Sequence, residues 1–277
     1  TKGADLVHDP YADHPLVSSC FVPHSISSVS DDAFRELRVM ADQLDKRVPI
    51  HLQESAREVA ESVAQTGKRP VDRLDEFGLL NASLMAVHAV HLNDDEIDRF
   101  AAVGVSVAHC PRANLKLADG LARVQDLLDA GITVGLGTDS AASNNVLEMP
   151  GEMRTAALLA KTKANDAAAL PAAAALRMAT LEGARTIGLD HCIGSLEPGK
   201  WADLACIDLG YINSQPVYDP LSQLVYTVQP NQVSDVWVAG RQQVENGALT
   251  QIDQADILRR ASEWHGRIAG SANQEST

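Results

Sequence analysis

Five short apolar segments of the sequence are each followed or ended by a side chain that can bind a metal or move a proton. The five residues are His24, His51, His88, His109 and Asp139. The chain has nine histidines, so one histidine in such a place would carry little weight, whereas four in five places are hard to attribute to chance. Imidazole and carboxylate bind zinc and iron, and histidine is also a general base near neutral pH. The pattern therefore predicts a metal or acid–base site.

Glu54 follows His51 by three residues. A glutamate at this spacing can reach a water on the metal without itself binding the metal, which is the geometry that a proton shuttle needs. Acidic residues are also favoured where a helix begins. The sequence leaves both roles open for Glu54.

Three further positions carry alternatives. His88 and His91 face opposite sides if their segment is extended, and His88, inside the apolar run, is the better candidate for the site. His109 either lines the site or satisfies a backbone group. Asp139 lies in Gly-Leu-Gly-Thr-Asp-Ser, where the glycines permit a tight turn directly after a strand; a purely structural turn is the alternative.

The elements that must position these residues alternate along the chain. Strands are expected at 16–22, 48–52, 84–90, 103–108 and 132–136, and helices from Asp31, over 54–64, from an N-cap at Asn93, and over 121–130 up to Gly131. Such alternation predicts a parallel sheet with crossover helices. The carboxyl ends of parallel strands share one edge, where ligands bind. A doubly wound sheet and part of an eight-stranded barrel both fit.

The later part of the chain has a different pattern. Residues 147–188 are expected to be helical with a break at Pro171, and strands are expected at 202–208 and 233–238. A last helix over 254–268 precedes a polar tail that we expect to be disordered. We therefore divide the chain into a hydrolase barrel portion (1–190), a small β segment (191–252) and a C-terminal helix with its tail (253–277).

Composition excludes some classes of partner. The formal net charge of -14 disfavours nucleic acid polymers and anionic membranes, and no apolar run approaches the roughly 18 residues of a membrane span. The four cysteines are scattered without a Cys-x-x-Cys pair, which favours reduced thiols and a cytoplasmic protein. The HExxH, GxSxG and phosphate-loop motifs are absent, as is the Pro-Cys-x-x-Cys half of the cytidine-deaminase zinc site.

Several motifs appear together in the order known from one family. They lie at His51–Glu54, Val87–Leu92, Ala108–Leu117, Gly135–Asn145 and Gly194–Leu204. From about Leu16 to Ile252, the chain resembles the amidohydrolase superfamily, in the branch that holds triazine hydrolases, guanine deaminases and 5'-methylthioadenosine/S-adenosylhomocysteine deaminases.

The resemblance implies an α/β fold, a distorted (β/α)8 TIM-type barrel of which strands four to eight are present here, with a small β-sandwich. It implies one divalent metal, zinc before Fe²⁺, with His51 and Asp139 as ligands. Glu54 would carry protons, His88 would hydrogen-bond the attacking hydroxide or the developing oxyanion, and Asp139 would also aim the attacking water. His24 would contact the substrate, together with Glu54 and Asp139.

One feature of the family is missing. The family takes two further metal ligands from a His-x-His pair on its first strand, and this sequence contains no such pair. Three preceding βα units would add about 90 residues. Either they lie outside this sequence, or the chain cannot hold zinc with full affinity; we favour the first, because a fragment would expose sheet edges.

The expected activity is hydrolytic deamination of 5'-methylthioadenosine or S-adenosylhomocysteine. The context of His24 and the Ser-Asn-Asn run after Asp139 favour that substrate. Guanine or 8-oxoguanine deamination and triazine hydrolysis are the close alternatives. A different class of function, an inactive fragment that acts as an interaction module, stays open. The expected partner is a small purine nucleoside, and the branch suggests a homo-oligomer.

Overall fold

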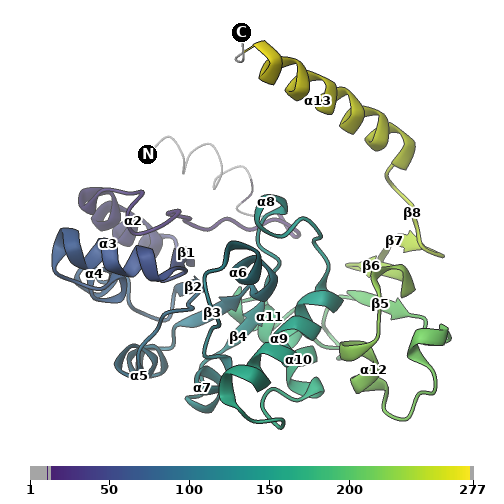
Figure 1. Ribbon diagram of the computed structural model, residues 1–277, viewed down its shortest axis with the longest axis horizontal. Helices are drawn as coiled ribbons and strands as arrows, with labels where there is room; N and C mark the ends of the chain where they lie inside the picture. Colours follow the sequence, from purple (N-terminus) through teal and green to yellow (C-terminus); the bar gives the residue numbers. More distant parts are fainter. Residues whose placement is uncertain (1–10, 12–13, 275–277) are drawn as a thin grey trace.

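The computed structural model describes residue 11 and residues 14–274, with side chains as far as residue 269. Within that range, the strands form two sheets of four (Figure 1). The first sheet is parallel in the order β1-β2-β3-β4. Its strands are β1 (Val48–Leu52), β2 (Leu84–His88), β3 (Ser106–His109) and β4 (Val134–Leu136). Four of the five expected strands are thus confirmed, with small changes at their ends.

Helices connect these strands in the expected alternation. They are α2 (Asp31–Gln43) before β1, α3 (Ala56–Thr66) and α4 (Pro70–Glu76) before β2, α5 (Asp94–Val103) before β3, and α6 (Pro111–Leu117) and α7 (Val124–Asp129) before β4. Asn93 caps α5, as predicted, and the structure adds a complete capping box with Glu96. Ser55 caps α3, and the acidic residue in its first turn is Glu58. Glu54 therefore does not open the helix, and that interpretation of it is wrong.

The strand expected at 16–22 is not formed. Phe21 N–H donates to Arg47 O at 3.1 Å and His51 N–H donates to His24 O at 3.1 Å, so the segment runs beside β1. In this part of the described chain, a single isolated β-bridge, between Ser25 and His51, pairs the segment with β1. Pro23 has no N–H to donate, which interrupts a ladder at this point.

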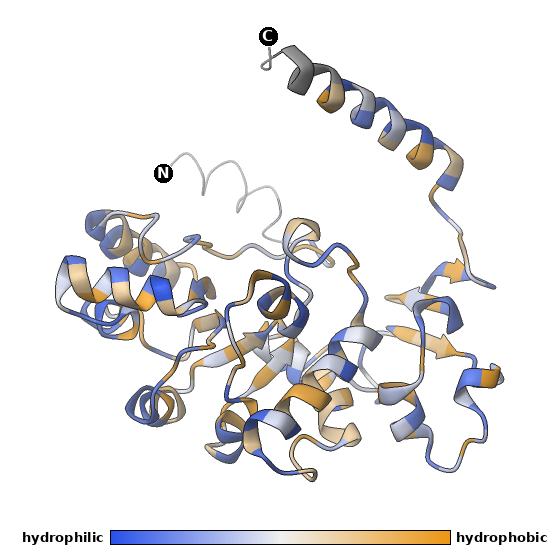
Figure 2. Ribbon diagram, in the orientation of Figure 1, coloured by the Kyte–Doolittle hydropathy of each residue, from blue (hydrophilic) through white to orange (hydrophobic). Residues whose placement is uncertain are grey.

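In β1 and β2 the core packs against one face of the parallel sheet, and the half-buried Pro49 and Met85 on the other face line a cavity. β1 and β2 alternate fully buried and half-buried residues, and the strands are mainly apolar in Figure 2. The helical stretch broken at Pro171 is confirmed: α9 (Met149–Ala164), α10 (Ala172–Ala179) and α11 (Leu181–Thr186). A Cβ on Gly135 of β4 would come within 2.9 Å of the Gly183 backbone. The absence of both side chains lets α11 pack directly on β4.

The second sheet is antiparallel and less buried. It contains β5 (Leu204–Ile207), β6 (Val233–Val238), β7 (Arg241–Glu245) and β8 (Ala248–Leu249), with α12 (Pro220–Tyr226) between β5 and β6. Its strands contain half-buried and exposed residues only. The sequence predicted β5 and β6.

The last helix, α13 (Gln254–Gln274), extends away from the rest of the molecule in Figure 1. The expected disordered tail is therefore wrong for 269–274, while residues 275–277 lie outside the described residues. In the part of the chain that the structure describes, no helix has both the length and the apolar character required to cross a membrane.

Candidate active site

Three of the predicted residues meet at the carboxyl end of the parallel sheet. Potential ligand atoms of His51, His88 and Asp139 all lie within 4.8 Å of one another. The strand register explains this, because Leu52 of β1 is paired with His88 of β2, and the two imidazole rings stack with centroids 5.3 Å apart. Imidazole and carboxylate are donors of the kind that catalytic zinc sites use, and His51 and Asp139 supply one of each. The residues present therefore fit a divalent cation.

His51 is held by the segment that precedes β1. Its Nδ1 donates to the carbonyl oxygen of His24 at 2.7 Å, which leaves Nε2 free to act as a ligand. The exposed His24 ring stacks on His51 with centroids 4.6 Å apart. Both histidines and Glu54 line a cavity of about 200 Å³. His24 therefore lies at the mouth of the site, where a substrate would enter.

His88 is fully buried, and burial lowers the pKa of its imidazole to about 4. Asn114 on α6 donates from Nδ2 to His88 Nδ1 at 3.0 Å. With Nδ1 accepting, the proton of the neutral ring lies on Nε2. This nitrogen has no hydrogen-bond partner and lies 3.4 Å from Glu54 Oε1. In this arrangement His88 is a hydrogen-bond donor, which leaves ligation to His51 and Asp139.

The Glu54 carboxyl group has an unusual proton affinity. Burial, together with the negative charge of Asp119, raises its pKa to about 7, although His51 opposes the shift. Its side chain is 25% exposed, so water can reach it. A carboxyl group that titrates near neutral pH can both take and give a proton under ordinary conditions.

Asp139 adopts a left-handed backbone with φ of 57°. The glycines before it were expected to make this turn, but neither Gly135 nor Gly137 has a positive φ. The carboxylate accepts a very short hydrogen bond from the hydroxyl of Ser143 on α8 (Ala141–Asn144). The turn is therefore set by the aspartate itself and by the short helix that follows.

Left-handed residues gather where the strands end. Gln53, His88, Ala89 and Asp139 all have φ between 49° and 72°. A residue other than glycine in this region costs about 1–3 kcal/mol and persists only when its surroundings hold it. The strain is located at the ends of β1, β2 and β4, beside the residues with chemical roles.

Sequence reasoning missed some of the residues around the site. Asn114 lies within the quoted motif at Ala108–Leu117 and could have been found from it. Ser143 lies in the quoted motif at Gly135–Asn145, which indicated a substrate preference but not its contact with Asp139. Asp119 stands in no pattern that indicated a role. Asp119 has one carboxylate oxygen buried without a hydrogen-bond partner, and burial raises the pKa of its carboxyl group.

The remaining two histidines lie outside the ligand group. His91 Nε2 lies 2.6 Å from Asp119 O and donates to it, as expected of the histidine that points away from the site. His109 is buried at the end of β3, and burial lowers its pKa to about 3. Its Nδ1 has no hydrogen-bond partner, so it does not satisfy a backbone group through that atom.

Known proteins share this sequence and geometry. The chain is 44% identical over 267 residues to a protein of Teredinibacter turnerae named 5-methylthioadenosine/S-adenosylhomocysteine deaminase, with 96% of this chain and 60% of that protein covered. Among solved structures, an adenosine deaminase from Xanthomonas campestris with bound zinc has a TM-score of 0.96 and 48% identity, over 97% of this chain and 61% of that one. Atrazine chlorohydrolase from Arthrobacter aurescens, complexed with zinc, has a TM-score of 0.84 and 30% identity. The match covers 92% of this chain and 58% of that one.

The chain spans about 60% of the length of the curated relatives that it matches. A family model described as the amidohydrolase family matches residues 11–242. The matched range covers the parallel sheet and strands β5 and β6, and it ends within β7. It includes every candidate site residue. The resemblance inferred from the motifs is confirmed, and the chain belongs to the amidohydrolase family.

Proposed function

We propose that the protein is a metal-dependent hydrolytic deaminase of 5'-methylthioadenosine or S-adenosylhomocysteine, which releases ammonia and the inosine analogue. The observation that carries the proposal is the Glu54 carboxyl group. Its pKa of about 7 and its position 3.4 Å from the buried donor His88 suit proton transfer at neutral pH. The names of the sequence relatives support the substrate class.

The donor set supports a metal. His51 and Asp139 would hold the ion, and zinc is favoured over Fe²⁺ because two of the similar solved structures contain zinc. A divalent cation held by these residues would supply Lewis acidity, which would lower the pKa of bound water to about 7. Nδ1 of His51 is held by His24 O, so the ring is already oriented for ligation through Nε2.

The protein's own groups account for the proton movements. Glu54 would take a proton from the attacking water and give it to the ring nitrogen next to the carbon that bears the amine. It would then help move the remaining proton of the added hydroxyl group to that amine, so that the carbon–nitrogen bond breaks and ammonia leaves. Asp139, fixed by Ser143, would accept a hydrogen bond from that water and aim it. His88 would donate from Nε2 to the oxygen on which charge develops. His24, at the mouth of the cavity, would contact the nucleoside.

The finer architecture belongs to the same proposal. The four parallel strands would be the later strands of a distorted (β/α)8 barrel, in a unit that spans residues 1–190. The antiparallel sheet would belong to a small β-sandwich within 191–252. The four free cysteines favour a cytoplasmic protein, and we propose a homo-oligomer on the basis of the family alone.

The test is release of the leaving group by the full-length protein loaded with zinc, measured as ammonia for the purine substrates and as chloride for the chlorotriazine. The substrates are 5'-methylthioadenosine, S-adenosylhomocysteine, adenosine, guanine and a chlorotriazine, and the variant is Glu54→Gln. We expect rapid release from the two thioethers and a loss of about 10²–10⁴-fold in kcat for Glu54→Gln, the usual contribution of general acid–base catalysis. Glu36→Gln, which removes an exposed carboxylate on α2, is the control and should keep full activity.

Other outcomes change the assignment. Activity on guanine or the triazine alone would keep the mechanism and move the substrate; the atrazine chlorohydrolase likeness makes the triazine the more informative of the two. No measurable turnover of any of the five substrates, together with no bound metal, would overturn the deaminase proposal. An interaction module would then be the remaining function.

A further inference from the structure

Gln53 lies between His51 and Glu54 on the chain. Its side chain is completely buried, and its backbone is left-handed with φ of 50°. Its amide Nε2 donates to Glu96 Oε2 at 3.0 Å, and its carbonyl oxygen accepts from His91 N–H at 3.1 Å. The turn that carries Glu54 is thus held by Glu96 of α5 and by His91, which follows β2.

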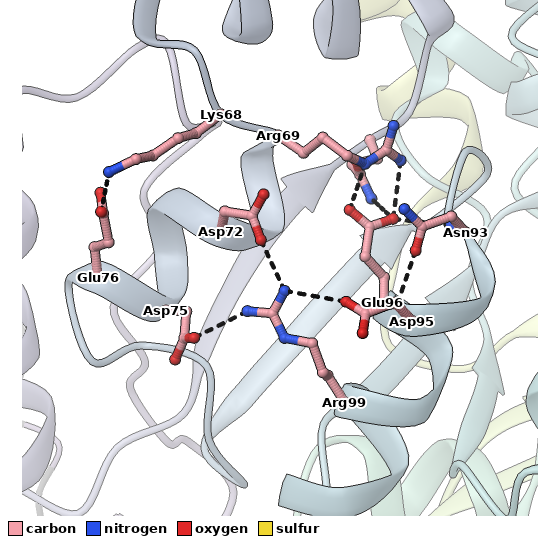
Figure 3. Close-up of polar contacts among 10 residues, drawn as sticks. Lys68, Arg69, Asp72, Asp75, Glu76, Asn93, Asp95, Glu96 and Arg99 are labelled. Carbon is pink, nitrogen blue, oxygen red and sulfur yellow. Dashed lines mark hydrogen bonds and ion pairs between the residues drawn. The ribbon is translucent and has the colours of Figure 1, made fainter.

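Glu96 is the centre of this arrangement. Its side chain is 1% exposed, and both carboxylate oxygens are occupied. Arg69 donates from Nε to Oε1 at 2.7 Å and from NH2 to Oε2 at 2.9 Å, while Asn93 N–H donates to Oε2 at 2.9 Å. Figure 3 shows this forked contact between the guanidinium and the carboxylate. A bidentate, buried pair of this kind fixes direction as well as distance.

Arg69 also reaches the strand end that carries His88. Its NH2 group donates to His91 O at 2.7 Å, three residues beyond His88. The same guanidinium therefore joins the turn after β1, through Glu96 and Gln53, to the turn after β2, through His91. These two turns carry Glu54 and His88, whose side chains must both face the attacking water in the proposed mechanism.

We propose that Arg69 and Glu96 are positioning residues, whose buried ion pair holds the left-handed Gln53 turn and so keeps Glu54 beside His88. Neither residue contacts the reacting atoms. Without the fork, the Gln53 amide loses its oriented acceptor and the strained backbone can relax toward a more ordinary conformation. Glu54 would then rotate away from the water and ring nitrogen that it serves. This inference rests on the proposed role of Glu54.

The molecule offers a matched control. Arg99 joins the same two helices, α4 and α5, through Asp72 at 2.8 Å and Asp75 at 2.9 Å, also visible in Figure 3. Its side chain is 25% exposed, compared with 29% for Arg69. The guanidinium of Arg99 pairs with the surface carboxylates of Asp72, Asp75 and Asp95 instead of with Gln53 or His91. Arg69→Lys and Arg99→Lys therefore make the same chemical change in the same interface, with and without a link to the site.

The first measurement is kinetic. Lysine keeps the charge beside Glu96, so the protein should fold, but it lacks the planar fork. For Arg69→Lys we expect kcat to fall about 10-fold or more, since small misplacements of a catalytic group can cost up to about 10². KM and metal content should change less than about twofold. Arg99→Lys should leave kcat unchanged, even if it lowers Tm as much as Arg69→Lys does.

A double-mutant comparison asks whether the effect passes through Glu54. In the Glu54→Gln background, Arg69→Lys should cause no further loss of kcat, because the group that it positions is already absent. Independent, multiplying losses would overturn the proposal. So would an equal kcat loss in Arg99→Lys, which would reduce the Arg69 effect to general destabilisation.

Hydrogen exchange of backbone amides provides a measurement without turnover. The amide of His91 donates to Gln53 O, and the amide of Glu54 donates to Glu58 Oε2. Both should exchange faster in Arg69→Lys than in Arg99→Lys, and equal rates would overturn the proposal. If the unaltered full-length protein deaminates nothing, the proposed function fails, while this comparison still decides whether the ion pair holds the turn.

Discussion

The two ends of the parallel sheet differ in what they bring together. The amino end opens on a cavity of about 610 Å³, beside Cys20, Arg47 and Met85. The carboxyl end has a cavity of only about 200 Å³, beside His24, His51 and Glu54. Yet the carboxyl end holds the convergent group of ligand atoms and several left-handed residues. Cavity size and the convergence of ligand atoms therefore point to different ends of the sheet.

The difference has a physical origin. All strands of the sheet are parallel, so their carboxyl ends and the loops that follow them meet at one edge. Side chains that are far apart in sequence can converge there, whereas the amino end is bordered by the residues that lead into the strands. Burial then changes the chemistry of what converges: it raises the pKa of Glu54 to about 7 and lowers that of His88 to about 4.

The largest expected effect comes from Asp139→Ala. Loss of the carboxylate removes the proposed metal ligand that also aims the water. We therefore expect kcat/KM to fall at least about 10³-fold. A fall of that size corresponds to the several kcal/mol by which a metal stabilises the transition state. Metal content, measured by atomic absorption, should fall with it. Cys20→Ser, at the larger cavity, should change neither. A comparable loss in Cys20→Ser would indicate that the functional site lies at the amino end of the sheet instead.

A second prediction concerns stability against pH. Burial lowers the pKa of His109 to about 3 from an ordinary value of 6.5. Between these values the unfolded chain binds a proton that the folded protein does not, so the free energy of unfolding decreases as pH falls through this range. At pH 4 the loss reaches as much as about 3 kcal/mol.

His109→Gln should make the loss of stability between pH 7 and pH 4 smaller, as measured by urea unfolding, while His88, whose pKa is lowered to about 4, continues to contribute. His265→Gln, at an exposed histidine of α13, is the control and should leave the slope unchanged. If His109→Gln loses stability on acidification as steeply as the unaltered protein, burial of this ring does not govern the response to acid.

The smallest expected effect is that of Ser143→Ala. The hydroxyl donates to the Asp139 carboxylate, and groups that orient a metal ligand typically contribute about 10–100-fold to metal affinity or activity. We expect a loss in that range, measured by competition with a zinc chelator. Ser19→Ala, beside the larger cavity, should bind metal unchanged. An unchanged affinity in Ser143→Ala would show that the α8 turn holds Asp139 without the hydroxyl.

The sequence determined by itself which strand ends carry chemical groups. The apolar runs before His51, His88 and Asp139 defined β1, β2 and β4, and Asn93 marked the start of α5. These features follow from local patterns, namely apolar periodicity and capping, which can be read without knowledge of contacts. The motifs also indicated the family, which the family model confirms.

Only the tertiary structure decided what those groups can do. The proton affinity of Glu54 depends on burial and on Asp119, the tautomer of His88 on Asn114, and the turn before Glu54 on Arg69 and Glu96. Each of these depends on residues from separate elements, whose distances are set by packing. The strand expected at 16–22 failed for a related reason, because pairing along β1 depends on a continuous partner that the local sequence, interrupted by Pro23, does not provide.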